Sequence, residues 1–125
     1  MKIKESGENY LEAILMLKKE KGNVRSIDVA HHLNVSKPSV SIAMKGLKEE
    51  GYITIDDAGG ITLTEAGLQI ADKMFERHHI LAMGLMALGV PEEIAYEDSC
   101  KIEHDLSNES FEKIKEHLKK MKRLP

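Results

Sequence analysis

The residues best suited to chemistry lie in the stretch Cys100-Lys101-Ile102-Glu103-His104. On a helix, Cys100, Glu103 and His104 stand at i, i+3 and i+4, so all three side chains project to one side. A thiolate, a carboxylate and an imidazole together resemble half of a transition-metal site. Because residues this close in sequence cannot complete a coordination shell, we expect other segments to supply further donors.

Two other segments carry suitable donors. These are His78 or His79 on a long predicted helix, and Glu12 with Asn9 on the first predicted helix. Each residue has an ordinary structural explanation when it is taken alone. A lone cysteine on a helix is usually a small buried hydrophobe, for example. The hypothesis of a metal site therefore depends on its combination with a second chemical signal.

That second signal is a predicted helix with a positive face. Lys37, Ser41, Lys45 and Lys48 share one side at about 100° per residue, and no acidic residue occurs from 37 to 48. Lysines neutralise phosphates, while short side chains can approach base edges. The candidate DNA contacts are Ser26, Lys37, Pro38, Ser39, Ser41, Ile42, Lys45 and Lys48, with Ile42 suited to a thymine methyl. The alternative is a surface helix with ordinary solvated lysines.

The elements around this face have the layout of a winged helix-turn-helix. Ser26 is the predicted N-cap of a short helix, and Asn34-Val35-Ser36 is a tight break in which Ser36 caps the next helix. Val40, Met44 and Leu47 form the predicted inward stripe of that second helix, and Gly51 ends it. Two β-rich runs, 52–55 and 61–64, follow with a turn between them, which predicts a hairpin.

The other elements are predicted helices, so the fold class is mainly α. One covers residues 5–21, and a long one capped by Thr64 extends to about Leu88. Its second half is apolar on all sides, which favours burial against a second subunit and thus a homodimer. The alternative is a central helix wrapped by its own chain. Two further helices begin at Pro91, running to about 106, and after the predicted cap Ser107.

We expect two domains: a winged helix-turn-helix in 1–66 and a helical metal-binding and dimerisation domain in 67–125. The net charge is −3, from 18 basic and 21 acidic residues, so any DNA-binding surface must be local and salt-sensitive. One cysteine excludes an internal disulfide and suits a reducing compartment. No stretch has the pattern of a signal peptide or a membrane span. These features predict a soluble cytoplasmic protein.

The ordered motifs resemble a known family, the iron- and manganese-dependent repressors of the diphtheria-toxin-repressor type, and especially the short manganese-transport-regulator branch. GENYLEAILML resembles the opening helix of that family, and SIDVAHHLNVSKPSVSIAMKGLKEEGYI resembles its DNA-reading unit. GGITLTEAG resembles the wing, while ERHHILAMGLMALGV and EDSCKIEHDLS resemble the metal and dimer helices. The resemblance covers nearly the whole chain.

The resemblance implies a ligand set. Cys100, Glu103 and His104 match the family's ligand motif, His78 matches its long-helix histidine, and Glu12 matches the first-helix carboxylate of the manganese branch. Asn9 stands where the manganese branch has Asp and the iron branch has Met. Two ligand positions of the iron branch's ancillary site are Ala82 and Tyr96 here, so that site is not intact.

The implied function is repression of metal uptake or storage genes, through palindromic double-stranded operator DNA bound by a homodimer. Mn(II) or Fe(II) is the implied activator, with up to two ions per subunit. Glu103 or Cys100 would lie between the two metal positions, one reached by His104 and Asn9 and the other by His78 and Glu12. Two alternatives stay open: a winged-helix regulator no longer gated by metal, and a metal-buffering protein or metalloenzyme built on the same cluster.

Overall fold

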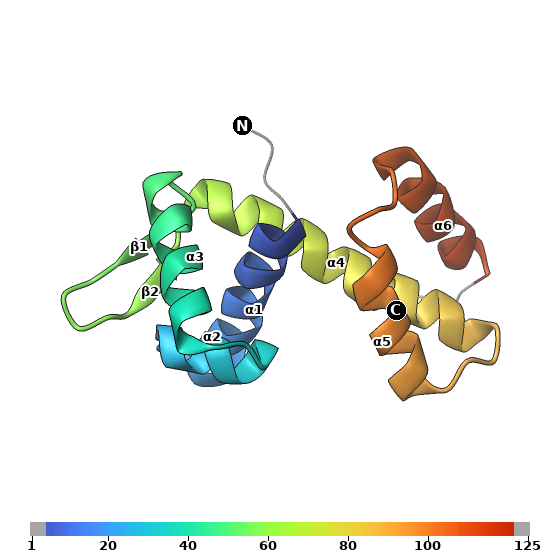
Figure 1. Cartoon of the computed structure of the whole chain (residues 1–125). Coiled ribbons are helices and arrows are strands. Elements are labelled where there is room, and N and C mark those ends of the chain that lie inside the picture. Colours follow the sequence, from blue (N-terminus) through green and yellow to red (C-terminus); the bar gives the residue numbers. More distant parts are fainter. Residues whose placement is uncertain (1–4, 122–125) are drawn as a thin grey trace. The chain divides into compact units, whose positions relative to one another are not determined.

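The computed structural model describes residues 5–121, and they form six helices and one hairpin (Figure 1). The elements are α1 (Glu5–Lys21), α2 (Ser26–Leu33), α3 (Lys37–Glu49), β1 (Ile53–Ile55), β2 (Ile61–Leu63), α4 (Glu65–Ala87), α5 (Glu92–Ile102) and α6 (Asn108–Lys120). They group into two compact units, which divide between Lys73 and Met74, within α4. The mainly α class with a two-stranded wing is confirmed. None of the described helices has the length and apolar character needed to cross a membrane.

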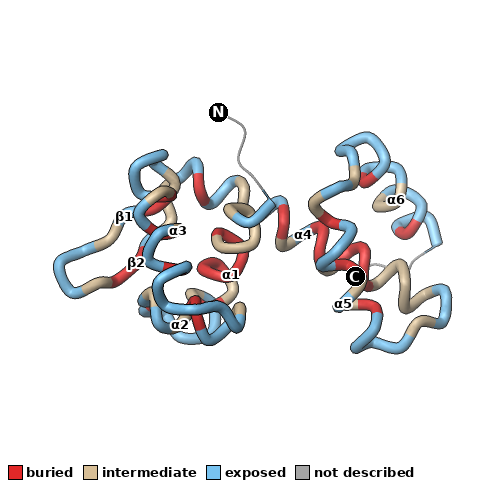
Figure 2. The backbone as a smooth tube through the Cα atoms, in the orientation of Figure 1, coloured by how far each residue is buried: buried red, intermediate tan, exposed pale blue. Residues whose placement is uncertain are grey.

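The first unit has its core among α1, α2 and α3. Leu11 and Ile14 of α1 are fully buried, as are Val29 of α2 and Val40 of α3, and Met44 is 2% exposed. Figure 2 shows buried stretches in red along these helices. The predicted inward stripe of the second reader helix is therefore confirmed, and it leaves the opposite side of α3 facing solvent.

The helix ends follow local chemistry at three of the four predicted caps. Ser36 accepts a hydrogen bond from the Ser39 amide (3.3 Å), Thr64 from the Gly67 amide (3.2 Å) and Ser107 from the Ser110 amide (3.1 Å). The prediction of Ser26 as an N-cap is wrong by one position, because Arg25 occupies the cap. The Arg25 amide donates the capping hydrogen bond to the Asp28 carboxylate (2.9 Å), so no serine hydroxyl is needed as a cap.

The wing is an antiparallel pair in which Ile53 lies opposite Leu63 and Ile55 lies opposite Ile61. Asp56 organises its turn, since one carboxylate oxygen accepts from the amides of Ala58 (2.9 Å) and Gly60 (2.8 Å). The base of the wing is tied to the first unit because the Ile61 amide donates to the carbonyl of Val24 (2.7 Å).

The second unit packs the last part of α4 with α5 and α6. Ile80 and Leu81 of α4 form one buried cluster with Phe111 and Leu118 of α6. The predicted extent of the helix after Pro91 is wrong at its end: α5 stops at Ile102 and Glu103 is its C-cap, instead of continuing to 106. In the turn that follows, the carbonyls of Glu103 and Leu106 accept hydrogen bonds from the buried side chain of Arg77.

Candidate metal centre and nucleic-acid interface

A cluster of possible metal donors lies within the second unit. His78 from α4, with Cys100 and Glu103 from the end of α5, each offer one ligand atom, and these atoms all lie within 4.8 Å of one another. His78 Nδ1 is 3.0 Å from Glu103 Oε2 and 3.5 Å from Cys100 Sγ. Glu103 is fully buried and His78 is 8% exposed, whereas Cys100 reaches the surface. Two elements far apart in sequence therefore bring nitrogen, sulfur and oxygen donors together.

Glu103 lies between two imidazoles. Its Oε2 faces His78, and its Oε1 is 3.3 Å from Nε2 of His104. Although α5 ends at Ile102, Glu103 keeps right-handed helical dihedral angles (φ −60°, ψ −29°) and its amide still donates to the Ser99 carbonyl. Cys100 and Glu103 therefore keep the i, i+3 spacing of a helix, whereas His104 already lies in the turn after α5.

The environment of His78 favours a protonated ring when no metal is present. Burial alone would lower its pKa, but hydrogen bonds to Cys100 and Glu103, together with their negative charges, raise the pKa to about 10. A metal ion that binds Nδ1 must therefore displace a proton held by the same anionic partners. The charge that stabilises the imidazolium is the charge that would stabilise a cation.

The donor set fits a divalent transition metal. Two ligands that share an ion at about 2.0–2.3 Å each lie roughly 3–4 Å apart, which matches the spacings of 3.0 and 3.5 Å about His78. Imidazole and thiolate suit iron, cobalt and zinc, while carboxylate oxygen also suits manganese. When bound, the ion would supply a fixed positive charge that ties α4 to the end of α5.

The remaining predicted ligands are His79 of α4 and Asn9 and Glu12 of α1. His79 does not join the cluster found among the described residues: its Nδ1 is 3.2 Å from the Tyr96 hydroxyl, and its ring lies edge-on to Phe75. Asn9 and Glu12 are on α1, in the first unit, where Asn9 is half-buried and Glu12 is buried at 6% exposure. They remain predicted ligands that depend on the resemblance.

Sequence reasoning missed two residues that contact the cluster. The Ser99 hydroxyl is fully buried, donates to the Tyr96 carbonyl (2.9 Å) and lies 3.1 Å from His78 Nδ1. Arg77, next to His78, reaches the backbone at Glu103. No periodicity or motif marks either residue, because serine and arginine are common on exposed helix faces and only the fold buries these two.

The predicted DNA face is accessible on α3. The candidates Lys37, Pro38, Ser39, Ser41, Ile42, Lys45 and Lys48 are all exposed, and Ser26 at the start of α2 is half-buried. Ile42 is 74% exposed, an unusual position for a large apolar side chain unless a partner covers it. Ser26, Lys37 and Ser41 line one small hollow of about 160 Å³ where α2 and α3 approach each other. The hollow thus brings together three of the residues expected to meet DNA, and the other candidates are exposed along α3.

Ser39 has a structural role beside its predicted one. Its amide donates the capping hydrogen bond to the Ser36 hydroxyl, and the hydroxyl oxygens of Ser36 and Ser39 lie 2.8 Å apart. The first turn of α3 is thereby held rigid by local bonds. A rigid first turn suits a helix whose N-terminal residues contact base edges.

Comparison with known protein families covers nearly the whole chain. The model of the iron dependent repressor N-terminal DNA binding domain matches residues 2–61. The model of the iron dependent repressor metal binding and dimerisation domain matches residues 64–125. The boundary between the two matches lies between residues 61 and 64, close to the start of α4 at Glu65.

Individual relatives agree. The chain is 36% identical over 120 residues to an uncharacterised helix-turn-helix transcriptional regulator of Methanocaldococcus jannaschii, covering 94% of this chain and 96% of that protein. It is 38% identical over 109 residues to the helix-turn-helix transcriptional regulator MntR of Bacillus subtilis, covering 87% and 77%. The solved structure of the manganese regulator SloR matches 90% of this chain with a TM-score of 0.80 and 26% identity, and this chain spans about half (53%) of its length. The resemblance predicted from the motifs is confirmed: the chain belongs to the iron-dependent repressor family.

Proposed function

We propose that this protein is a metal-dependent transcriptional repressor that binds operator DNA when Mn(II) or Fe(II) occupies its metal site. The observation that carries the proposal is the pairing of two features in one chain. One is the exposed face of α3 with its lysines, and the other is the cluster of His78, Cys100 and Glu103. The presence of a metal site and a DNA-binding face in the same chain is accounted for if metal binding changes the affinity for DNA. The family consists of repressors, and the chain is not an enzyme.

The proposed ligand set extends beyond that cluster. Glu103 would bridge toward two positions, since its two oxygens face His78 and His104. Asn9 and Glu12 of α1 would complete the coordination, as the resemblance implies, with up to two ions per subunit. Holding the reader in one orientation is how an ion would raise DNA affinity.

The choice of metal rests on charge and softness. Asn9 would contribute a neutral amide oxygen, so the negatively charged ligands would be Glu12, Cys100 and Glu103. A thiolate favours Fe(II) over Mn(II), whereas the carboxylates accept either ion. MntR and SloR, to which the chain is similar, are described as manganese or helix-turn-helix regulators. The donor set therefore suits both Mn(II) and Fe(II) as activators, and the binding assay distinguishes them.

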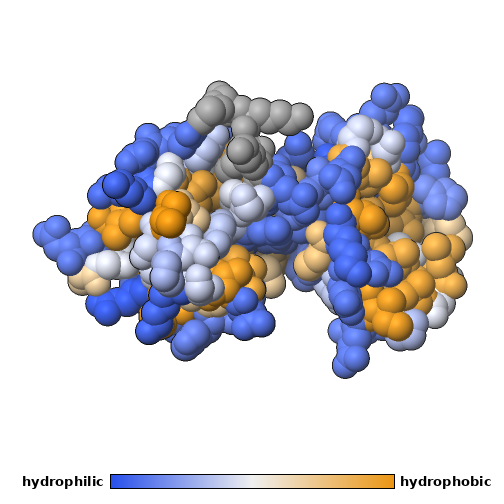
Figure 3. All heavy atoms as spheres, viewed as in Figure 1, coloured by the Kyte–Doolittle hydropathy of each residue, from blue (hydrophilic) through white to orange (hydrophobic). Residues whose placement is uncertain are grey.

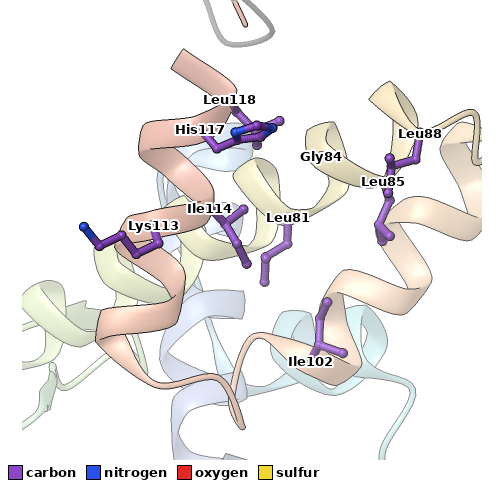
Figure 4. A pocket seen from close by; sticks show the side chains of 9 residues that line it. All are labelled: Leu81, Gly84, Leu85, Leu88, Ile102, Lys113, Ile114, His117 and Leu118. Atoms are coloured by element: carbon purple, nitrogen blue, oxygen red, sulfur yellow. The ribbon is translucent and has the colours of Figure 1, made fainter. Parts of the chain in front are cut away.

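The proposed assembly is a homodimer that reads palindromic DNA. The matched family domain is described as a dimerisation domain. The second unit carries a continuous apolar surface, visible in Figure 3. It includes a groove of about 440 Å³ that α4, α5 and α6 line with Leu81, Gly84, Leu85, Leu88, Ile102, Lys113, Ile114, His117 and Leu118 (Figure 4). Leu88 is 83% exposed and Ile102 is 42% exposed, so a second copy would remove substantial apolar area from water.

The test is DNA affinity measured by fluorescence anisotropy at fixed salt. The probe is a DNA duplex selected from a random pool with this protein and Mn(II). The proposed location of the protein in the cell is the cytoplasm. We expect weak binding with chelator and tight binding with Mn(II) or anaerobic Fe(II), through a coupling of about 1–3 kcal/mol. Glu103→Ala and His104→Ala should abolish the metal response while the dimer stays folded. Equal affinity with chelator and with every metal would refute metal gating and leave a winged-helix regulator with another effector.

A further inference from the structure

Arg77 is a buried cation that neither the ligand set nor the DNA face uses. It is 3% exposed and lies between Glu76 and His78 on α4. Its Nη1 donates to the carbonyl of Glu103 (2.9 Å) and to the carbonyl of Leu106 (2.6 Å). Its guanidinium carbon lies 5.2 Å from the centre of the Phe111 ring of α6. One side chain therefore connects α4 with the turn after α5 and with α6.

The partners of Arg77 are unusual for a buried charge. Within residues 5–121, no carboxylate forms an ion pair with Arg77, although buried charges normally have one. Its acceptors are carbonyls just beyond the last turn of α5, where unsatisfied carbonyl groups give a helix its partial negative charge. The aromatic face adds a second, weaker attraction. Arg77 thus acts as a cationic cap on the C-terminal end of α5.

The same end of α5 carries the metal donors. The carbonyl of Glu103 is held by Arg77, while its carboxylate oxygens face His78 and His104. His104 lies within the segment that Arg77 holds at both ends. Because Arg77 and His78 are consecutive, α4 contacts Glu103 twice: Arg77 holds its main chain and His78 holds its carboxylate.

We propose that Arg77 is a positioning residue for the metal centre, which fixes the Glu103–Leu106 turn so that Glu103 and His104 are presented to the ion. This inference rests on the proposed metal-dependent function. Without Arg77, the turn would lose the two bonds that hold it to α4, and the donors would have to be ordered by the metal itself. Partners of this kind, which hold a ligand without touching the metal, typically contribute 10–100-fold to metal affinity.

The experiment compares three variants of the full chain by Mn(II) titration, with free Mn(II) followed by electron paramagnetic resonance. Arg77→Met keeps the apolar stem but removes the charge and both donors, and should weaken Mn(II) binding by about 10–100-fold. Arg77→Lys keeps a cation able to donate to carbonyls and should recover part of that loss. Phe111→Leu removes only the weaker aromatic contact of Arg77 and keeps both of its hydrogen bonds, so it should lower the melting temperature with a much smaller loss of Mn(II) affinity than Arg77→Met. Circular dichroism confirms that each variant is folded.

The outcomes are separable. If the unmodified chain itself fails to bind Mn(II), the proposed function fails. If the unmodified chain binds and folded Arg77→Met binds equally well, the positioning role of Arg77 is refuted. The same holds if Phe111→Leu weakens Mn(II) binding as much as Arg77→Met, because the loss would then reflect packing. Should Arg77→Met not fold, Arg77→Gln replaces it: weakened Mn(II) binding that Lys partly restores supports the proposal, and native affinity overturns it.

Discussion

Replacing Gly67 by alanine should displace the wing and cost stability. Gly67 lies in the first turn of α4, and a Cβ added there would stand 2.1 Å from the carbonyl oxygen of Tyr52 and 3.0 Å from its carbonyl carbon. The first distance is 1.3 Å shorter than the 3.4 Å at which ordinary contact begins. The obstacle is backbone, so no side-chain rotation relieves it. The Tyr52 carbonyl also accepts the Thr64 amide (3.0 Å), so moving it breaks a bond beside the α4 cap.

The magnitude follows from two opposing effects. Forcing one extra carbon into a packed site costs about 1–3 kcal/mol, and a collision with backbone belongs at the top of that range. Alanine gains about 1 kcal/mol over glycine in a helix. The expected net loss is therefore about 2 kcal/mol in the free energy of unfolding, or roughly a 30-fold shift of the folding equilibrium.

The assay is urea denaturation followed by circular dichroism, with Gly46→Ala as the matched control. Gly46 lies within α3 and an added Cβ would meet nothing within 4 Å. That variant should gain about 0.5–1 kcal/mol from helix preference alone. If Gly67→Ala proves as stable as Gly46→Ala, the close approach of α4 to Tyr52 is not a constraint and the reasoning is refuted.

Three further predictions concern the metal centre, the α2 cap and the dimer. Because the pKa of His78 is raised from 6.5 to about 10 in the metal-free protein, the bound proton stabilises the metal-free fold fully below pH 6.5, and this stabilisation is lost as the pH rises through 10. Mn(II) must displace at least this proton, so its affinity should increase at least about tenfold per pH unit between 6.5 and 8. A flat profile by calorimetry would contradict this. Hydrogen bonds from Lys21 and the Arg25 amide lower the pKa of Asp28, so the stabilisation that its carboxylate gives the fold is present above pH 4 and disappears as the pH falls through the lowered value. In thermal melts at pH 7, Asp28→Ala should cost about 1 kcal/mol, and Asp57→Ala in the wing turn should have no comparable effect. Leu88→Glu should shift the sedimentation coefficient toward that of a monomer, because it places a charge on the apolar surface of the second unit. The control Ile27→Glu, on the first unit, should leave the dimer intact. A stable Leu88→Glu dimer would exclude this surface as the interface.

Local pattern was enough to predict the elements, since their signals act over a few residues. Helical spacing marked the inward stripe of α3, and Ser36, Thr64 and Ser107 capped the helices that they were expected to cap. The donor residues near the end of α5 could be predicted because three ligand types at i, i+3 and i+4 form a pattern that sequence displays directly.

What only the tertiary structure decided are the interactions between segments distant in the chain. The turn after Ile102 accepts two hydrogen bonds from Arg77, a residue 25 positions before Ile102, and no local propensity reports such a contact. The choice between His78 and His79 likewise depends on how α4 turns toward α5: a step of about 100° sends one imidazole to Glu103 and the other to Tyr96. Sequence determined which ligand types this protein carries and where its helices begin, because those follow from side-chain chemistry and short-range bonds. Packing determined which of them meet, because burial and contact between elements are properties of the whole fold.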